Sequence, residues 1–380
     1  MKKNMLISLM LGITVSAAAL YLAFRNVPFT ELVIYMTSIN YFWVFPSVLI
    51  ILIAFGLRVF RWQIILGSGP ESCPAGRIGF WRAFHPLMIG FMLNCILPGR
   101  VGEVARPVIL QKKDNVPFST GLATVAAERV FDLGLLIILF GIVFSFVRID
   151  PDFSIPFGDY QLNREMLEVV GRGLLNLIIF LIIGIVMLSI RATRMFMNRI
   201  IMGIPSLFFF AGASFKEKIK EKVCSVLVSF VENFASGFSL VRSPKKMGIC
   251  VCLSVMIWSL HAFSYYSFAL GCPGIGLSYP EITAVMVIVC FFIALPSVPG
   301  FWGLWEAGGI FALSLFGVSS NDAAGFTLAN HVLQIFPVII VGFVSAMITG
   351  VNIWQVSYQK LGSEKLKKEF GEPDEKILQR

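Results

Sequence analysis

Three ionisable residues follow a Pro-Gly pair in the segment NCILPGRVGEVARPVIL, residues 94–110. Arg100, Glu103 and Arg106 are spaced by three, so on a helix they cover an arc of about 120° and form one ionic flank. The planar fork of an arginine binds phosphate through two parallel hydrogen bonds. Backbone N–H groups just after the Pro-Gly pair would begin a helix without partners and would also favour an anion. The segment therefore predicts a site for a phosphate-bearing ligand.

A second ionisable group, Glu128, Arg129 and Asp132, interrupts the apolar segment 119–147. Glu128 comes nine residues into that segment, a rise of about 14 Å that would place it near the centre of a bilayer. A charge at that depth costs about 2.5–3.5 kcal/mol or more, and such charges usually pair. We expect Arg129 to pair with Asp132 or with Glu103.

A third group surrounds Glu306, which lies in the segment LPSVPGFWGLWEAG, residues 295–308. Further polar residues come from the last apolar segment and from just before the first break: Asn330, His331, Gln334 and Asn94. Residues that break a helix mark both segments: Pro98, Gly99 and Gly102 in the first, and Pro296, Pro299, Gly300 and Gly303 in the second. The chemistry of these groups depends on the solvent around them.

The composition identifies that solvent as lipid. Of the 380 residues, 57% are hydrophobic and 14% are charged, whereas soluble domains are about 45–50% apolar and about 25% charged. Segments of alternating polarity, which a membrane barrel would need, are not seen. We predict an all-α fold, a polytopic integral membrane bundle of helices.

Six apolar segments are long enough to cross the hydrocarbon core, which takes about 20 residues per helix: 5–24, 42–65, 119–147, 173–190, 247–270 and 325–349. Two shorter segments, 84–118 and 282–317, carry the Pro-Gly breaks. If the first of these crossed fully, its cationic end would face outside, against the positive-inside rule. We therefore predict about six full crossings and two re-entrant hairpins that enter from opposite faces. Broken helices in the two halves of a chain mark a transport site near the midplane.

The charge distribution orients this layout. The segment 191–222 carries seven Lys and Arg residues against two Glu, which indicates the cytoplasm, and the acidic segment 148–168 looks external. Apolar residues recur at helical spacing from 223 to 241, so an amphipathic cytoplasmic segment is predicted within 191–245.

The ends of the chain are both predicted to be cytoplasmic, in the cell membrane. We divide the chain into a transmembrane domain, 1–350, and a charged cytoplasmic tail, 351–380. The first apolar segment is too long for the core of a signal peptide, although the stretch VSAAA keeps cleavage as an alternative.

Several kinds of chemistry find no support in the sequence. The seven cysteines lie mostly in apolar segments, with no C-x-x-C pair and no His at ligand spacing, so neither a disulfide framework nor a metal site is expected. GRVGEV lacks the Gly-Lys-Ser/Thr of a P-loop. The acidic pair of DPD, 150–152, fits an external loop better than the metal site of a glycosyltransferase. The net charge of +9 fits basic loops beside anionic lipid. We expect no cofactor, no metal and no nucleic-acid partner.

A structural explanation stands beside the functional one. Buried ion pairs often fix packing and nothing more, and Pro-Gly elements often act as simple kinks. We expect His85 and His261 to be interfacial or core residues. Arg58 and Arg61, beside Trp62, are expected at a membrane interface, where long cations and Trp side chains belong.

Together, the motifs N-x-x-LPGRVGEVAR, AERVFDL and LPSVPGFWGLWEAG resemble the lysylphosphatidylglycerol synthase transmembrane family, over residues 5–350. The resemblance implies a flippase-like membrane domain. In the family the aminoacyl transferase is a separate soluble domain after the membrane part, so the resemblance implies the lipid-handling half here. The matching residues are Asn94, Pro98, Gly99, Arg100, Gly102, Glu103 and Arg106 in the first motif, Glu128, Arg129 and Asp132 in the second, and Pro299, Gly300, Gly303 and Glu306 in the third.

We expect a lipid translocase rather than an enzyme, moving a phospholipid or a polyprenyl-phosphate lipid across the membrane. Three arginines would hold the phosphate, and three glutamates would balance charge or bind an amine. The residues assigned to head-group binding or translocation are Asn94, Arg100, Glu103, Arg106, Glu128, Arg129, Asp132, Glu306 and His331. The partners would be membrane lipids and a soluble lipid-modifying synthase. The alternatives are a membrane enzyme or accessory subunit of envelope lipid or glycan biosynthesis, and a scaffold that recruits a synthase through 191–222.

Overall fold

The computed structural model describes residues 27–68, 78–97, 100–146, 154–157, 160–163, 190–207, 243–294 and 299–352, with scattered residues elsewhere. Three of the predicted breaking residues, Pro98, Gly99 and Pro296, lie outside the described residues, as does most of the predicted tail.

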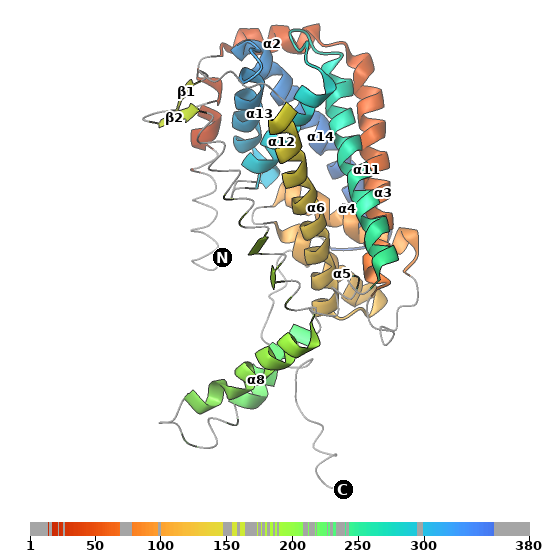
Figure 1. Cartoon of the computed structure of the whole chain (residues 1–380). Coiled ribbons are helices and arrows are strands. Elements are labelled where there is room, and N and C mark those ends of the chain that lie inside the picture. The colour runs from red at the N-terminus through yellow and green to blue at the C-terminus, as the bar shows by residue number, and fades with distance from the viewer. Residues whose placement is uncertain are drawn as a thin grey trace.

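Long apolar helices form the body of the molecule (Figure 1). Three of them are long and apolar enough to cross a membrane: Tyr41–Leu66, Pro244–Ala269 and Ser320–Thr349. They contain α3 (Val44–Leu66), α11 (Pro244–Ala269) and α14 (Ser320–Thr349). A fourth predicted span corresponds to α6 (Phe118–Phe146). The prediction of an all-α membrane bundle is confirmed. The number of crossings stays a prediction, because the segments 5–24 and 173–190 lie largely outside the described residues.

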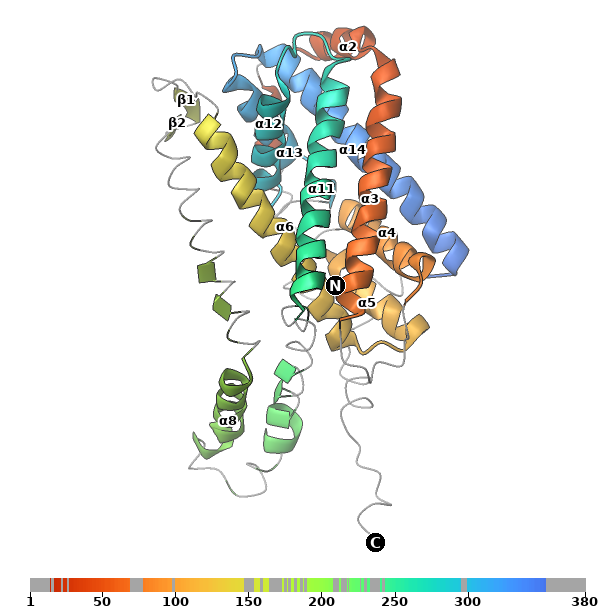
Figure 2. The ribbon, with the colours of Figure 1, turned by 45° about the vertical axis from the view of Figure 1, so that its right-hand side comes forward.

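Two helical hairpins occupy the places where re-entrant segments were predicted. The first consists of α4 (Phe80–Ile96) and α5 (Val101–Asp114). The second consists of α12 (Tyr279–Phe292), the short turn η4 (Pro299–Phe301) and α13 (Leu304–Ser314). At 1.5 Å per residue each helix is about 26 Å long or less, short of the roughly 30 Å of a hydrocarbon core. Figure 2 shows the two hairpins at opposite ends of the bundle.

The tips of the hairpins meet between those ends. Arg100, at the first tip, donates from Nη2 to the backbone oxygen of Ile293 at 3.2 Å. A Cβ built on Gly300, at the second tip, would lie 3.2 Å from the backbone oxygen of Cys95. Both turns need left-handed backbone, since φ is 53° at Arg100 and 72° at Gly300. Gly300 adopts this conformation without the steric cost that a Cβ would add.

Glycine residues allow α4 to approach α5 and α14 closely. A Cβ on Gly102 of α5 would collide with the backbone oxygen of Gly90 in α4. A Cβ on Gly342 of α14 would likewise collide with Met92 of α4. Close backbone contact through small residues is a common way for helices to associate in a membrane, where no water drives them together.

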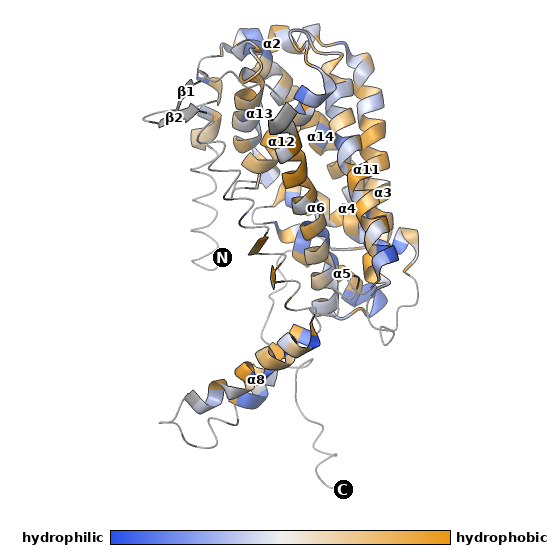
Figure 3. Cartoon of the chain, viewed as in Figure 1, coloured by the Kyte–Doolittle hydropathy of each residue, from blue (hydrophilic) through white to orange (hydrophobic). Residues whose placement is uncertain are grey.

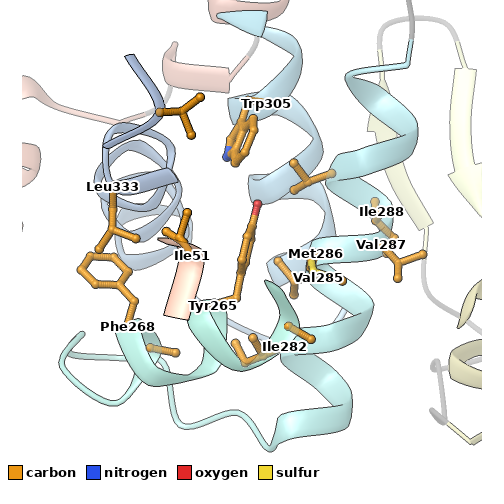
Figure 4. Packing of buried hydrophobic residues seen from close by; sticks show 14 of the residues in the cluster. Ile51, Tyr265, Phe268, Ile282, Val285, Met286, Val287, Ile288, Trp305 and Leu333 are labelled. Carbon is orange, nitrogen blue, oxygen red and sulfur yellow. The ribbon is translucent and has the colours of Figure 1, made fainter. Parts of the chain in front are cut away.

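The apolar core lies between α11, α12, α13 and α14 (Figure 4). Tyr265 of α11 points its hydroxyl toward Trp305 of α13, with ring centroids 6.4 Å apart. Ile51 of α3 and Phe268 of α11 pack in the same cluster and are almost completely buried. The residues of α5 are more hydrophilic than those of the apolar helix α6 above it (Figure 3).

Three segments differ in detail from the sequence-based expectation. The predicted linker 25–40 contains the helix α2 (Phe29–Ser38). A short hairpin, β1 (Ser154–Phe157) and β2 (Tyr160–Asn163), occurs in the segment predicted to be external.

The basic segment 191–222 begins with the helix α8 (Arg191–Leu207). Met195, Phe196 and Ile200 are exposed on it, while Arg194 lies 3.3 Å from Glu232. This helix lies inside 191–245, where the amphipathic segment was predicted, but it precedes the apolar stripe expected at 223–241. Most of the apolar stripe predicted for 223–241 lies outside the described residues.

The close contact of α4 and α5 predicts that Gly102→Ala destabilises the protein. The added methyl group would collide with Gly90 and would lie 2.7 Å from the Asn94 side-chain oxygen. Overpacking of this kind costs about 1–3 kcal/mol, so the thermal unfolding midpoint of the detergent-purified protein should fall. Gly134→Ala is the control, because a Cβ there meets nothing within 4 Å. Equal midpoints for the two variants would contradict the packing described.

Candidate functional site

A network of buried charges joins α3, α5 and α6. We call it the arginine–carboxylate cluster. Its members come from helices distant in the sequence and are Arg58, Arg61, Glu103, Arg106, Glu128, Arg129 and Asp132.

Asp132 of α6 is the most heavily paired carboxylate of the cluster. Its oxygens lie 2.8 Å from Nη1 of Arg61, 3.1 Å from Nη1 of Arg58 and 3.7 Å from Nη1 of Arg129. Asp132 is 5% exposed and Arg61 is fully buried. Charges so far from water require partners, because desolvation costs several kcal/mol per ion.

Glu128, one turn earlier on α6, is held from two other directions. Nη2 of Arg106 lies 2.5 Å from Glu128 Oε2, and Nη2 of Arg61 lies 3.7 Å from Oε1. The guanidinium carbon of Arg106 also lies 4.1 Å from the ring centroid of Trp62. Trp62 in turn donates from Nε1 to Thr124 Oγ1 at 3.1 Å. The first hairpin is thereby tied to α3 and α6 by charge and by stacking.

One edge of the cluster reaches solvent-accessible space. Glu103 lies 3.5 Å from Nε of Arg129 and 3.9 Å from Nη1 of Arg100. These three side chains are 25%, 28% and 44% exposed, respectively. Phe91 of α4 lies beneath the network, with its ring centroid 5.5–6.0 Å from the guanidinium carbons of Arg58, Arg106 and Arg129.

Positive charge exceeds negative charge in this cluster. Four arginines face three carboxylates, and Arg100 at the open edge adds another cation. Within the described part of the chain, Nε and Nη1 of Arg106 and Nε of Arg58 have no hydrogen-bond partner. Guanidinium donors without partners and a surplus of cations suit an anion with several acceptor oxygens.

A second polar centre lies at the other hairpin. Glu306 and His331 are fully buried, and Nδ1 of His331 lies 2.5 Å from Glu306 Oε1. Nε2 of His331 lies 2.8 Å from the backbone oxygen of Gly300. The other oxygen of Glu306 accepts a 2.7 Å hydrogen bond from the N–H of Gly303.

The predicted site residues therefore form two groups. Glu103, Arg106, Glu128, Arg129 and Asp132 belong to the arginine–carboxylate cluster, and Arg129 contacts both partners that the sequence suggested. Glu306 and His331 form the separate pair. Arg100 lies at the edge of the cluster and also contacts the second hairpin.

Asn94 has a local structural contact. Its side-chain oxygen accepts from the N–H of Gly102 at 2.8 Å, and the N–H of Glu103 bonds to the backbone oxygen of Arg100 at 3.0 Å. The hypothesis that the first amides of α5 stay free for an anion is therefore wrong for these two groups. The anion site must rely on the arginine side chains.

Arg58 and Arg61 were missed by reasoning from the sequence. They were expected at an interface, but they are 7% and 0% exposed and form ion pairs with Asp132. In the structure both arginines lie on the buried face of α3, together with Ile51, Ala54, Trp62 and Ile65. His261 is half-buried, and its Nε2 lies 3.4 Å from Nη2 of Arg58.

An apolar groove of about 380 Å³ lies between α6, α11 and α12, within the roughly 300–1,000 Å³ typical of ligand pockets. Its lining includes Trp258, whose ring centroid lies 6.0 Å from the guanidinium carbon of Arg58. The groove thus adjoins the cluster. Its lining consists of Leu135, Leu139, Ile142, Val255, Trp258, Ser259, Ala262, Tyr279, Pro280 and Thr283. No group of three metal-binding side chains occurs among the described residues.

Removal of Arg61 should destabilise the fold strongly. In Arg61→Met, Asp132 and Glu128 would each lose a cation at a buried position. Breaking a buried pair from one side costs about 3–5 kcal/mol. Unfolding of the purified protein by denaturing detergent measures the loss. Arg82→Met is the control, since Arg82 is 75% exposed and lies 3.6 Å from Asp114, so a loss of about 0–1 kcal/mol is expected. Equal losses would contradict a buried network.

Several curated proteins are similar to this chain. A UPF0104 membrane protein of Methanocaldococcus jannaschii is 24% identical over 263 residues, which are 69% of this chain and 95% of that protein. A UPF0104 membrane protein of Methanothermobacter thermautotrophicus is 23% identical over 309 residues, 77% of this chain and 80% of that protein.

A larger protein, the glycosyltransferase AglD of Haloferax volcanii, is 23% identical over 276 residues. The match covers 67% of this chain but 41% of AglD, so this chain corresponds to less than half of that protein. No solved structure matches the chain.

The family model for the lysylphosphatidylglycerol synthase TM region matches residues 9–342, which include both hairpins and the arginine–carboxylate cluster. The chain therefore belongs to the lysylphosphatidylglycerol synthase TM region family.

Proposed function

We propose that this protein translocates a phosphate-bearing lipid, a phospholipid or a polyprenyl phosphate, across the cytoplasmic membrane. The observation that carries the proposal is the cation surplus of the arginine–carboxylate cluster. Buried charges are expensive, and a network built for packing alone would be better served by equal numbers of cations and carboxylates. A phosphate group would supply the missing negative charge.

The open edge of the cluster is the entrance for the head group. Arg100 and Arg129 are partly exposed there and flank Glu103. The unpartnered N–H groups of Arg106 lie deeper in the same cluster. Glu103 is the one carboxylate at the edge with substantial exposure, so it is the natural partner for an amine on a zwitterionic or aminoacylated head group.

The apolar groove between α6, α11 and α12 offers a place for part of the hydrocarbon chain. It adjoins the cluster at Trp258 and has an apolar lining. A lipid lying there could keep its chain among apolar residues while its phosphate contacts arginines. This division of polar and apolar surface fits an amphiphile better than it fits a small polar solute.

The two hairpins suggest how the head group could change sides. Their tips meet at Arg100 and Gly300, between the two ends of the bundle. Polar sites between broken helices near the midplane are typical of transporters that alternate their access. The basic segment 191–222 would face the cytoplasm, with both termini on that side.

A second candidate function is supported by the similarity to AglD, which is named as a glycosyltransferase. In that case the membrane domain would act as an enzyme or as an accessory subunit in envelope lipid or glycan biosynthesis. A third role is a scaffold that recruits a soluble lipid-modifying synthase through the basic segment. We favour translocation because five of the seven charged side chains of the arginine–carboxylate cluster are buried.

Arg100→Gln and Arg129→Gln should each slow lipid translocation. A hydrogen bond to a charged group contributes about 1.5–3 kcal/mol, so each change should reduce the rate roughly tenfold or more. The assay follows a fluorescent phosphatidylglycerol that becomes accessible to a membrane-impermeant reductant in proteoliposomes of the full chain. Arg82→Gln, which removes an exposed arginine outside the cluster, should retain the wild-type rate. Wild-type rates in both cluster variants would rule out this head-group site.

Direct turnover separates the translocase from the enzyme. We expect the purified protein to form no new lipid when it is mixed with a membrane lipid acceptor and an activated sugar or aminoacyl donor. Mass spectrometry of the extracted lipids is the measurement. A new lipid product that disappears in the Arg100→Gln variant would instead support the enzyme.

A further inference from the structure

The hydrogen bonds of Glu306 and His331 determine where protons must lie on this pair. Gly300 offers a backbone oxygen to Nε2 of His331 at 2.8 Å. A carbonyl oxygen can only accept, so Nε2 must carry a proton. The opposite nitrogen, Nδ1, lies 2.5 Å from Glu306 Oε1. That contact also needs a proton, located on one atom or the other.

The proton count follows from these two contacts. Two protons must be distributed over the histidine and the glutamate for both hydrogen bonds to exist. The pair is then either imidazolium with carboxylate, or neutral imidazole with carboxylic acid. In both forms the pair is neutral overall. The other glutamate oxygen, Oε2, already accepts from the N–H of Gly303, so the exchangeable proton lies between Oε1 and Nδ1.

Two aromatic rings lie against the histidine. Trp305 stacks parallel to it, with centroids 4.5 Å apart and an angle of 4° between the planes. Trp302 lies 4.4 Å away at 48°. Aromatic faces stabilise a cation through their negative quadrupole. The pair is thus packed beside aromatic rings at a place where both of its side chains are fully buried.

Loss of the proton would disrupt the second hairpin. Without it, lone pairs of Oε1 and Nδ1 would face each other at 2.5 Å, and a net negative charge would remain in a site without solvent exposure. Either Glu306 would separate from His331, or the remaining proton would move to Nδ1 and release the Gly300 oxygen. Each change acts on the hairpin tip that touches Cys95 and Arg100 of the first hairpin region.

Three neighbouring segments contribute ionisable groups near the pair. Helix α13 supplies Glu306 itself, and α11 supplies Tyr265, which stacks on Trp305 at 6.4 Å. Helix α12 supplies Cys290, close to Tyr265. From the first hairpin, Arg100 reaches the backbone oxygen of Ile293. The carboxylate of Glu306 is the acid among these that contacts His331 directly.

We propose that the Glu306–His331 pair is a proton-binding site that couples lipid movement to a proton gradient. The proposal rests on the proposed translocase function and names its driving ion. A proton would enter from water on one side of the membrane, remain between Oε1 and Nδ1, and leave to the other side. No other bond forms or breaks, and the occupied and empty states differ in the position of the hairpin tip. Chains of buried Glu and His are typical proton sites in transporters.

The test uses full-length protein in vesicles of phosphatidylcholine and phosphatidylglycerol, with a fluorescent phosphatidylglycerol as the probe. The ratio of translocation rates with and without an imposed pH gradient is the readout. The wild type should give a ratio clearly different from one. Glu306→Gln should bring the ratio to one, because an amide can still accept from Gly303 but cannot hold the proton.

Glu281→Gln is the matched control. Glu281 also stands three residues after a helix N-cap, where its carboxylate accepts from Ser278 N–H at 2.7 Å, but it does so at the exposed start of α12. This variant should keep the wild-type ratio. A ratio of one in the wild type, with lipid movement still sensitive to Arg129→Gln, would overturn the coupling and leave the translocase intact.

Protonation itself is measured independently of transport. Infrared difference spectra of the full chain between acidic and alkaline buffer should contain carboxylic-acid or imidazolium bands that vanish in Glu306→Gln and persist in Glu281→Gln. Spectra that are identical in the wild type and Glu306→Gln would overturn the proton site even if no lipid moves.

Discussion

Asp132 imposes the constraint on which the arrangement of the first half of the bundle depends. A carboxylate as buried as that of Asp132 is tolerated only with cations around it. Three arginines from α3 and α6 surround it. Glu128 adds Arg106 of α5 to the same network. The ion pairs thus connect the first hairpin to two long helices. The charges that position these helices are also the charges that leave a positive surplus for a ligand.

The second hairpin also contains a buried carboxylate, that of Glu306, but no arginine of the described residues pairs with it. Its buried carboxylate is compensated by a histidine, two tryptophan rings and a backbone amide. An arginine is a permanent cation, whereas a histidine can gain or lose its charge under physiological conditions. The permanently charged arginines therefore lie in the cluster where a phosphate is expected to bind. The histidine, His331, contacts the tip of the second hairpin. Membership of the lysylphosphatidylglycerol synthase TM region family fits this division without specifying the lipid.

Much of the fold was predictable because the membrane restricts the choices. Pro-Gly pairs in short apolar segments predicted both hairpins, and the ionic spacing on α5 and α6 predicted the contacts of Arg129. The positions of Arg58 and Arg61 were not predicted, because an arginine near the end of an apolar run looks the same whether it reaches water or a carboxylate. Deciding between the two required the tertiary partner, Asp132, which lies 74 residues from Arg58 in sequence. The contact of His331 with Glu306 was not predicted either. The two residues are 25 positions apart in different helices, and no short sequence pattern links them.

The bond between Asn94 and the amide of Gly102 has a mechanical consequence. This hydrogen bond joins α4 to α5. The backbones of the two helices are also in direct contact at Gly90 and Gly102. Any movement of this hairpin relative to α3 and α6 would therefore also have to break the contacts of Arg106 with Glu128 and Trp62.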